Sequence, residues 1–202
     1  MAITRERFAQ GMGYIDYKEQ MTRNRDRLEE NERTLELAPE DVAFFAELPR
    51  PLNVLVLAED WCGDVIANLP VLGRLAEESG KLNLSIFLRD QNLDLMDQYL
   101  KDGQHRSIPV FAFFDQDFRE LGHWIERPAR ISELQGAMTA DLYANDPAFA
   151  EVAPGTGMAL LPEAARDRLM QAFGEFRAST RDEANREVAR ELRELVRRGL
   201  AA

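Results

Sequence analysis

The chain has 202 residues, of which 45% are hydrophobic and 30% charged, and its formal net charge is −11. This length and hydrophobic share are sufficient for a domain of ordinary size with a buried core, which excludes a wholly disordered chain. The acidic charge repels phosphate backbones and anionic lipid headgroups, so we expect neither nucleic acid nor a membrane surface as a partner.

Targeting and metal-binding signals are not found in the sequence. The N-terminal residues MAITRER lack the apolar stretch of a signal peptide, and no apolar run approaches the roughly 18 residues that span a bilayer. The single cysteine, Cys62, excludes an intrachain disulfide and a cysteine-rich zinc site, and the two histidines have no metal-ligand spacing. We therefore expect a cytoplasmic protein that needs no metal and no cofactor.

The N-terminal quarter of the chain has a helical pattern. Residues 4–37 are polar with scattered apolar positions, a spacing that is compatible with helix, broken only by two glycines. Pro39 and the acids after it open a second short helix over 41–48. We expect residues 1–51 to form a helical extension that packs on the following domain.

The middle of the chain alternates short apolar runs with stretches of helical periodicity. The order strand, helix, strand, helix, strand, strand is typical of an α/β domain in which a parallel pair is followed by a hairpin. We expect this domain over 52–145, with a central mixed sheet of about four or five strands flanked by helices. In chain order, the predicted elements are strand 52–58, helix 65–79, strand 82–88, helix 93–100, strand 110–114 and strand 118–124.

Only helices are predicted beyond residue 131. One covers 131–142, and a long helical stretch covers 162–200, so residues 146–202 form a C-terminal helical extension. The last turns carry an apolar stripe that includes Val188 and Leu192. Such a stripe docks either on its own domain, which is the commoner case, or on a second copy in a homodimer.

The residues with a specific chemical signature surround the lone cysteine. Cys62 stands where the first predicted strand ends and a helix begins, which is the sheet edge where α/β proteins carry their sites. Unpaired N–H groups and the helix dipole lower the pKa of a thiol at this position. The neighbouring Glu59, Asp60 and Asp64 raise it, and the sequence does not determine which effect is larger.

Trp61-Cys62-Gly63 resembles the Trp-Cys-Gly-Pro-Cys motif of thioredoxins. From about Leu52 to Pro128 the chain is similar to the thioredoxin family, which implies a thioredoxin-like fold. The final stretch of this region is most similar to a bacterial subgroup with Trp-Cys-x-Asp-x motifs. The other matches, in order, are Pro70 within the next helix, Arg89-Asp90-Gln91-Asn92, Ser107-Ile108-Pro109-Val110, Phe113-Phe114-Asp115 and Gly122.

The resemblance implies a substrate groove beside Cys62. Pro109 would be a cis-proline next to the thiol, and Ile108 would line the same groove as Trp61. The peptide before Pro109 would offer its backbone groups to an extended substrate. The candidate site therefore consists of the catalytic Cys62 and the groove residues Trp61, Gly63, Asp64, Ile108 and Pro109.

Two catalytic parts of the family pattern are replaced. Val65 stands in place of the second, resolving cysteine, and Val56 in place of the buried carboxylate that assists proton transfer. A mixed disulfide on Cys62 could then not be resolved within the chain. Asp64 replaces the motif proline, and stabilisation of the helix start explains it at least as well as catalysis does.

Three hypotheses follow. In the first, the chain is at most a weak monothiol thiol–disulfide oxidoreductase, in which Cys62 forms a mixed disulfide with a protein or a low-molecular-weight thiol. In the second, the groove is a non-catalytic module that binds a peptide or protein. In the third, the fold is a degenerate scaffold for assembly. A thiol pKa well below about 8.5 favours chemistry, and one at or above it favours a passive role.

Overall fold

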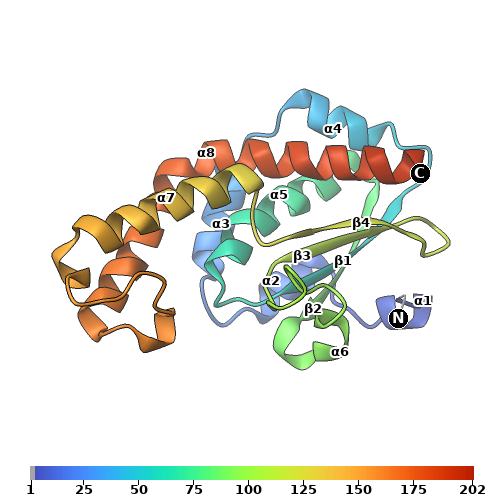
Figure 1. Cartoon of the computed structure of the whole chain (residues 1–202). Helices are drawn as coiled ribbons and strands as arrows, with labels where there is room; N and C mark the ends of the chain where they lie inside the picture. The colour runs from blue at the N-terminus through green and yellow to red at the C-terminus, as the bar shows by residue number, and fades with distance from the viewer. Residues whose placement is uncertain (1–2) are drawn as a thin grey trace. The chain divides into compact units, whose positions relative to one another are not determined.

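A computed structural model describes residues 3–202 and contains one four-stranded mixed sheet in the order β2-β1-β3-β4 (Figure 1). β1 (Leu52–Ala58) pairs in parallel with β2 (Leu82–Leu88) and antiparallel with β3 (Val110–Phe114). β4 (Glu120–Ile125) pairs antiparallel with β3. This arrangement confirms the predicted α/β class and its mixed sheet.

β1 lies between β2 and β3, and every one of its residues is buried, as expected for a largely apolar strand inside a sheet. β4 begins later than predicted. The chain turns through Asp115–Arg119, where the Asp115 side chain accepts hydrogen bonds from the N–H groups of Asp117 and Arg119 and Phe118 has a φ of +60°. Pairing therefore resumes only at Glu120.

The helical stretch predicted over 4–37 consists of three short helices, α1 (Arg5–Phe8), α2 (Tyr14–Gln20) and α3 (Arg25–Arg33), and the first break contains the two glycines. Between the first two, Met12 pairs with Ile86 on the outer edge of β2, so the chain is extended there. Asn24, with a φ of +56°, separates the next two. α4 (Pro39–Ala46) begins at its proline.

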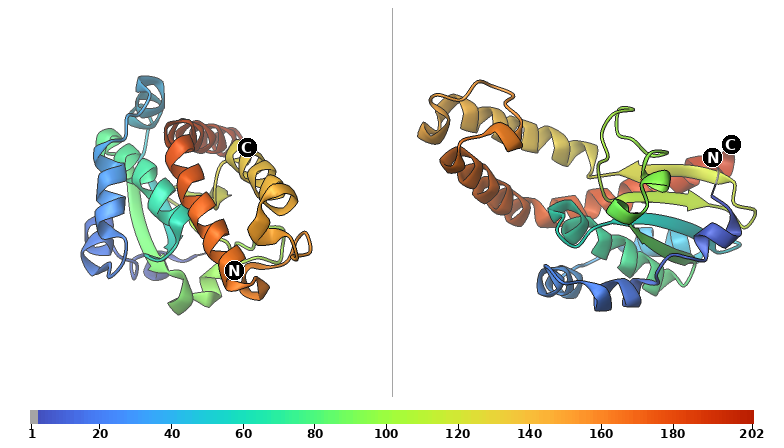
Figure 2. Two further views of the ribbon diagram at one scale, coloured as in Figure 1. Left: turned by 90° about the vertical axis from the view of Figure 1, so that its left-hand side faces the viewer. Right: turned by 90° about the horizontal axis from the view of Figure 1, so that it is seen from below.

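α5 (Gly63–Ser79) follows β1, and α3 and α4 pack against it (Figure 2). Pro70 lies inside α5 and has no N–H to give to the carbonyl of Ile66, four residues earlier. The Asn31 side-chain amide of α3 donates to that carbonyl instead, at 2.9 Å. α5 ends at Gly80, whose φ of +62° gives the left-handed C-cap that the sequence predicted.

The remaining helices are α6, α7 and α8. α6 (Leu93–Met96) follows the 3-10 turn Arg89–Gln91 and is shorter than predicted. α7 (Ala129–Asn145) and α8 (Glu163–Ala201) are joined through the 3-10 turns Pro147–Phe149 and Met158–Leu160. None of the helices described over 3–202 has the length and apolar character of a membrane span.

The chain divides into two compact units. The first comprises residues up to Arg127 together with Asn185–Ala202, and the second is Pro128–Ala184. The domain limits expected at residues 51 and 145 stay predictions. Within the first unit, the stripe at the end of α8 is docked inside the chain: Val188, Leu192 and Val196 are fully buried in the core that contains the sheet.

The second unit has a core of its own, formed by α7, the turns and the first part of α8. Phe149 is its largest fully buried side chain, in ring contact with Tyr143. The Arg168 guanidinium pairs with the Asp146 carboxylate at 2.7 Å, so α8 is tied to the segment after α7.

Candidate functional site

Cys62 lies at the positive end of α5. It is the N-cap residue, with extended backbone angles, and its carbonyl accepts the N–H of Ile66 at 3.1 Å. Its own N–H donates to the Glu59 carbonyl at 3.2 Å, so a tight turn joins β1 to the helix. The sulfur is therefore fixed where unpaired helix N–H groups emerge.

The loop before β3 lies against the thiol. The Ile108-Pro109 peptide bond is cis, as the family resemblance implies. The Cys62 thiol donates to the Ile108 carbonyl, with 3.6 Å between Sγ and oxygen. The structure thus brings the two most distant predicted site segments together, and this hydrogen bond requires the protonated form of the sulfur.

The segment after β4 forms a further side of the site. The Glu126 N–H donates to the Pro109 carbonyl at 2.7 Å, and the Asn68 amide of α5 donates to the Glu126 carbonyl at 2.9 Å. Arg127 then pairs with Asp64 at 2.5 Å and with Glu126 at 2.8 Å, and its side chain is only 15% exposed. A largely buried ion pair consequently borders Cys62.

The surroundings of the sulfur raise the pKa of the Cys62 thiol. Burial is the largest effect and raises the pKa of Cys62, and the Asp64 carboxylate raises it further. The N–H groups of Val65 and Asp64 and the Arg127 guanidinium lower the pKa but do not offset burial. The structure thereby decides between the opposing effects that the sequence left open.

Glu59 and Asp60, the other two acids of the motif, are engaged elsewhere. Glu59 is buried and accepts the Asp90 N–H at 2.8 Å. Asp60 accepts from the N–H and hydroxyl of Thr22 and from the N–H of Arg23. Both carboxylates therefore fasten neighbouring segments to the loop that carries Cys62.

Trp61 is 43% exposed, the most open of the predicted groove residues, whereas Ile108 and Pro109 are buried. The Arg89 guanidinium stacks on the Trp61 ring, 4.8 Å from its centroid. Arg89 also donates to the Arg106 carbonyl at 3.1 Å. One side chain from the end of β2 thus joins the motif loop to the loop before Pro109.

Comparison with known proteins agrees with this geometry. A family model described as thioredoxin matches residues 11–141. The chain belongs to the thioredoxin family. No curated protein matches its sequence.

Two solved structures share the fold. A Pseudomonas aeruginosa protein of unknown function is 22% identical, with a TM-score of 0.59, and the match covers 88% of this chain and 96% of that one. An HIV epitope scaffold is 19% identical, with a TM-score of 0.58 and the same two coverages. At these identities the likeness concerns the thioredoxin-like fold alone.

Two valines and a tyrosine are buried around the site. Val65 and Val56, at the positions where the resemblance led us to expect the resolving cysteine and the buried carboxylate, are fully buried. Tyr17 of α2 is also fully buried, and within residues 3–202 its hydroxyl has no hydrogen-bond partner. Burial, and then the charges of Asp60, Glu59 and Cys62, raise the pKa of its phenol.

Sequence reasoning missed three side chains that shape the site, Arg127, Asn68 and Arg89. Arg127 and its partner Asp64 are 63 residues apart, so no local spacing connects them. Arg89 falls within the segment Arg89-Asp90-Gln91-Asn92, and the resemblance of this segment to the family was the available signal. Across the described residues, no group of three or more His, Cys, Asp or Glu side chains could hold a metal ion.

Proposed function

We propose that this thioredoxin-family chain binds an extended segment of a partner polypeptide along Trp61, Ile108 and Pro109, with Cys62 kept as a protonated thiol. The observation that carries this proposal is the hydrogen bond from Cys62 to the Ile108 carbonyl, in a chain with no second cysteine. A neutral thiol is a poor nucleophile, so binding is supported better than turnover.

The backbone at Ile108 is suited to pairing with an extended chain. Its N–H has no hydrogen-bond partner among the described residues, and its carbonyl accepts only from sulfur, a weak donor. An incoming strand could supply a carbonyl to the first group and an amide N–H to the second, as in other edge-pairing modes. The exposed Trp61 ring would cover one side of the bound segment.

A second candidate, monothiol exchange, rests on the position of the sulfur at the helix N-terminus, where the N–H groups of Asp64 and Val65 favour thiolate. The Cys62 thiolate would attack a disulfide RS–SR′, form the mixed disulfide with R and release R′S⁻. An external thiol would then attack the mixed disulfide. The resemblance to bacterial proteins with Trp-Cys-x-Asp-x motifs supports this second candidate.

The pH dependence of Cys62 alkylation by iodoacetamide separates the two candidates. Since burial raises the thiol pKa, we expect the rate to be low at pH 7 and to rise only above about pH 9. A half-maximal rate below pH 7 would reject the binding proposal in favour of exchange. The same measurement in urea gives the unperturbed thiol as the reference.

Binding itself is tested with an unfolded polypeptide, reduced and carboxymethylated ribonuclease A, added to the ¹⁵N-labelled chain. We expect shifts of the Ile108 amide and the Trp61 indole, both retained in Cys62→Ser. In Trp61→Ala, the affinity measured from the Ile108 amide should fall at least several-fold. Leu160→Ala is the control, because Leu160 is 79% exposed but belongs to the second unit. Unmoved Ile108 and Trp61 resonances would contradict the proposal.

A further inference from the structure

A pocket of about 210 Å³ lies at the start of β1, whereas Cys62 follows the end of this strand. Its lining consists of residues 48–52, the turn 115–117 and Leu200 near the end of α8. All of these residues belong to the first unit. An apolar cavity of about 150 Å³ in another protein binds benzene, so this volume is sufficient for an aromatic ring system that leaves one edge at the mouth.

The floor of this pocket is apolar and rigid. Leu48 and Leu52 are buried, with exposed fractions of 5% and 3%. Pro49 and Pro51 lie between them, and their rings fix the backbone φ, so the wall has its shape before a ligand arrives. Leu200 is 43% exposed, and a ligand in the pocket would cover this apolar surface.

Two polar side chains of the lining are already used within the chain. The Asp115 carboxylate accepts two backbone N–H groups of its own turn, and the Gln116 side-chain amide donates to the Pro51 carbonyl. The Arg50 guanidinium and the Asp117 carboxylate, both on exposed residues, have no partner among the residues that the structure describes. The pocket therefore combines an apolar floor with one free cation and one free hydrogen-bond acceptor at its mouth.

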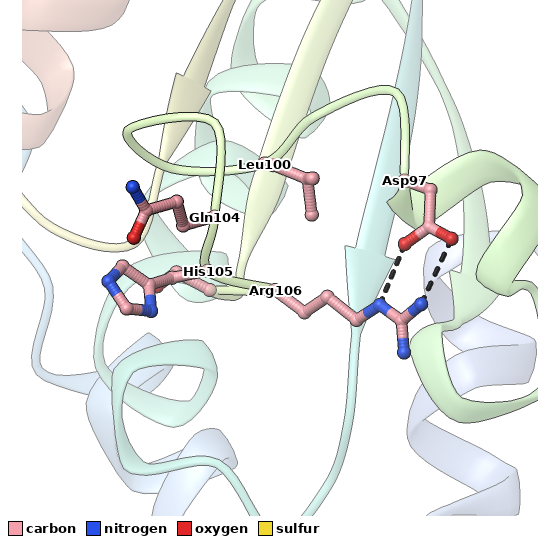
Figure 3. Close-up of a pocket in the computed structure, with 6 residues that line it drawn as sticks. Asp97, Leu100, Gln104, His105 and Arg106 are labelled. Atoms are coloured by element: carbon pink, nitrogen blue, oxygen red, sulfur yellow. Dashed lines mark hydrogen bonds and ion pairs between the residues drawn. The ribbon is translucent and has the colours of Figure 1, made fainter.

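A larger open pocket, in the loop after α6, lacks this combination. Figure 3 shows Arg106 bound to both oxygens of Asp97, with Gln104 and His105 on the other side of Leu100. The two charges neutralise each other, and the amide and the imidazole can each donate and accept. The larger pocket therefore selects no class of ligand.

We propose that the pocket at the start of β1 binds the indole ring of a tryptophan side chain that a partner protein presents. Among aromatic rings, the face of tryptophan attracts a guanidinium most strongly, so the free Arg50 favours it. The indole N–H is a donor only, which suits the free Asp117 carboxylate. Tryptophan is also enriched among the side chains that dominate the energy of protein interfaces. The site does not involve the groove beside Cys62 and goes beyond the proposed function.

The experiment titrates two probes into the ¹⁵N-labelled chain: 3-methylindole, which is the tryptophan side chain, and 1,3-dimethylindole, which lacks its N–H. We expect saturable shifts of the Leu52 and Leu200 amides and the Gln116 side-chain amide. The dimethyl probe should bind at least about fivefold more weakly, because it cannot donate to a carboxylate. Since the added methyl group makes this probe more apolar, a pocket that is only hydrophobic would bind it at least as tightly. That result, or no shift up to the solubility limit, would overturn the proposal.

Variants locate the binding. Asp117→Ala should remove the difference between the two probes, because the acceptor is lost while the apolar floor remains. Leu200→Ser should weaken both probes at least about fivefold. Leu93→Ser is the matched control, since Leu93 is 40% exposed against 43% for Leu200 and does not line the pocket. A difference between the probes that persists in Asp117→Ala, or undiminished binding in Leu200→Ser, would overturn the assignment.

A tryptophan peptide, acetyl-Gly-Trp-Gly-amide, and its leucine counterpart test whether the ring can arrive on a polypeptide. We expect the tryptophan peptide to shift the same resonances as 3-methylindole, and the leucine peptide to bind at least about fivefold more weakly. A pocket that takes 3-methylindole but excludes the tryptophan peptide would be a site for a free small molecule, which rejects the partner assignment. Equal binding of the two peptides would reject selection of the indole ring.

Discussion

The bond between Asn31 and the Ile66 carbonyl offers a sharp test of how α5 is stabilised. Pro70 leaves this carbonyl without its helical donor, and Ile66 is fully buried, so water cannot replace the amide. Asn31→Ala should therefore cost the desolvation of an unsatisfied carbonyl, about 1–3 kcal/mol of unfolding free energy.

The decisive perturbation is the same change in a Pro70→Ala background. Residue 70 then has an N–H that can reach the Ile66 carbonyl, so Asn31 becomes redundant. We expect Asn31→Ala to cost less than about 0.5 kcal/mol there, which gives a coupling energy of about 1–2 kcal/mol. The separate effect of Pro70→Ala does not enter this difference.

Urea unfolding followed by tryptophan fluorescence is a suitable assay, because both tryptophans, Trp61 and Trp124, lie in the first unit. Asn92→Ala is the control, since the Asn92 amide donates to the Leu88 carbonyl at 2.7 Å, away from Pro70. Its cost should be the same in both backgrounds. An equal cost of Asn31→Ala in both backgrounds would refute the argument.

Two further predictions concern charge and packing. Asp64→Asn removes a carboxylate that raises the pKa of Cys62, so the fraction of thiolate at pH 7 should increase. Because one pKa unit changes the thiolate fraction about tenfold, we expect iodoacetamide alkylation at pH 7 to accelerate several-fold. An unchanged or slower rate would contradict this prediction. Gly199→Ala would place a Cβ 2.3 Å from the Leu121 carbonyl oxygen and should destabilise the first unit by about 1–3 kcal/mol in thermal unfolding. Gly174→Ala, in open space on the same helix, should instead stabilise the protein by up to about 1 kcal/mol. Effects of the same sign in the two variants would contradict this prediction.

The sequence predicted elements best where local pattern and tertiary environment agree. β1, β2 and β3 have the expected bounds because each is an apolar run between breakers that becomes buried on the sheet. The N-terminal segment is helical as expected, but the course of the chain between its helices was not predicted, because Met12 pairs with β2, a contact 74 residues away in sequence (86 − 12). Helical periodicity contains no information about such a partner.

α6 shows the same limit on a smaller scale. Its apolar spacing extends to Leu100, yet the helix ends at Met96 and the chain continues in turns. Asp97, the next residue, is held by Arg106 across the loop. The loop after α6 therefore depends on a pair nine residues apart that sequence periodicity does not reveal.

At the site, the sequence identified the position of the thiol but not its electrostatics. The resemblance to thioredoxins implied that Pro109 lies near Cys62, and in the structure the thiol donates to the Ile108 carbonyl. The direction of the thiol pKa depended on burial and on Arg127, neither of which a strand-to-helix motif specifies. Helix N-terminus arguments alone would have favoured thiolate.

The direction of the Cys62 pKa follows from the surroundings of the sulfur. A thiolate at this position needs groups that replace its lost hydration, and the N–H groups of Val65 and Asp64 do not offset the effect of burial. Arg127 could compensate, but Asp64 and Glu126 already neutralise it. The sulfur therefore keeps its proton, and the Ile108 carbonyl accepts it. A protonated thiol does not favour attack on a disulfide, and this is the physical basis on which we propose binding rather than exchange.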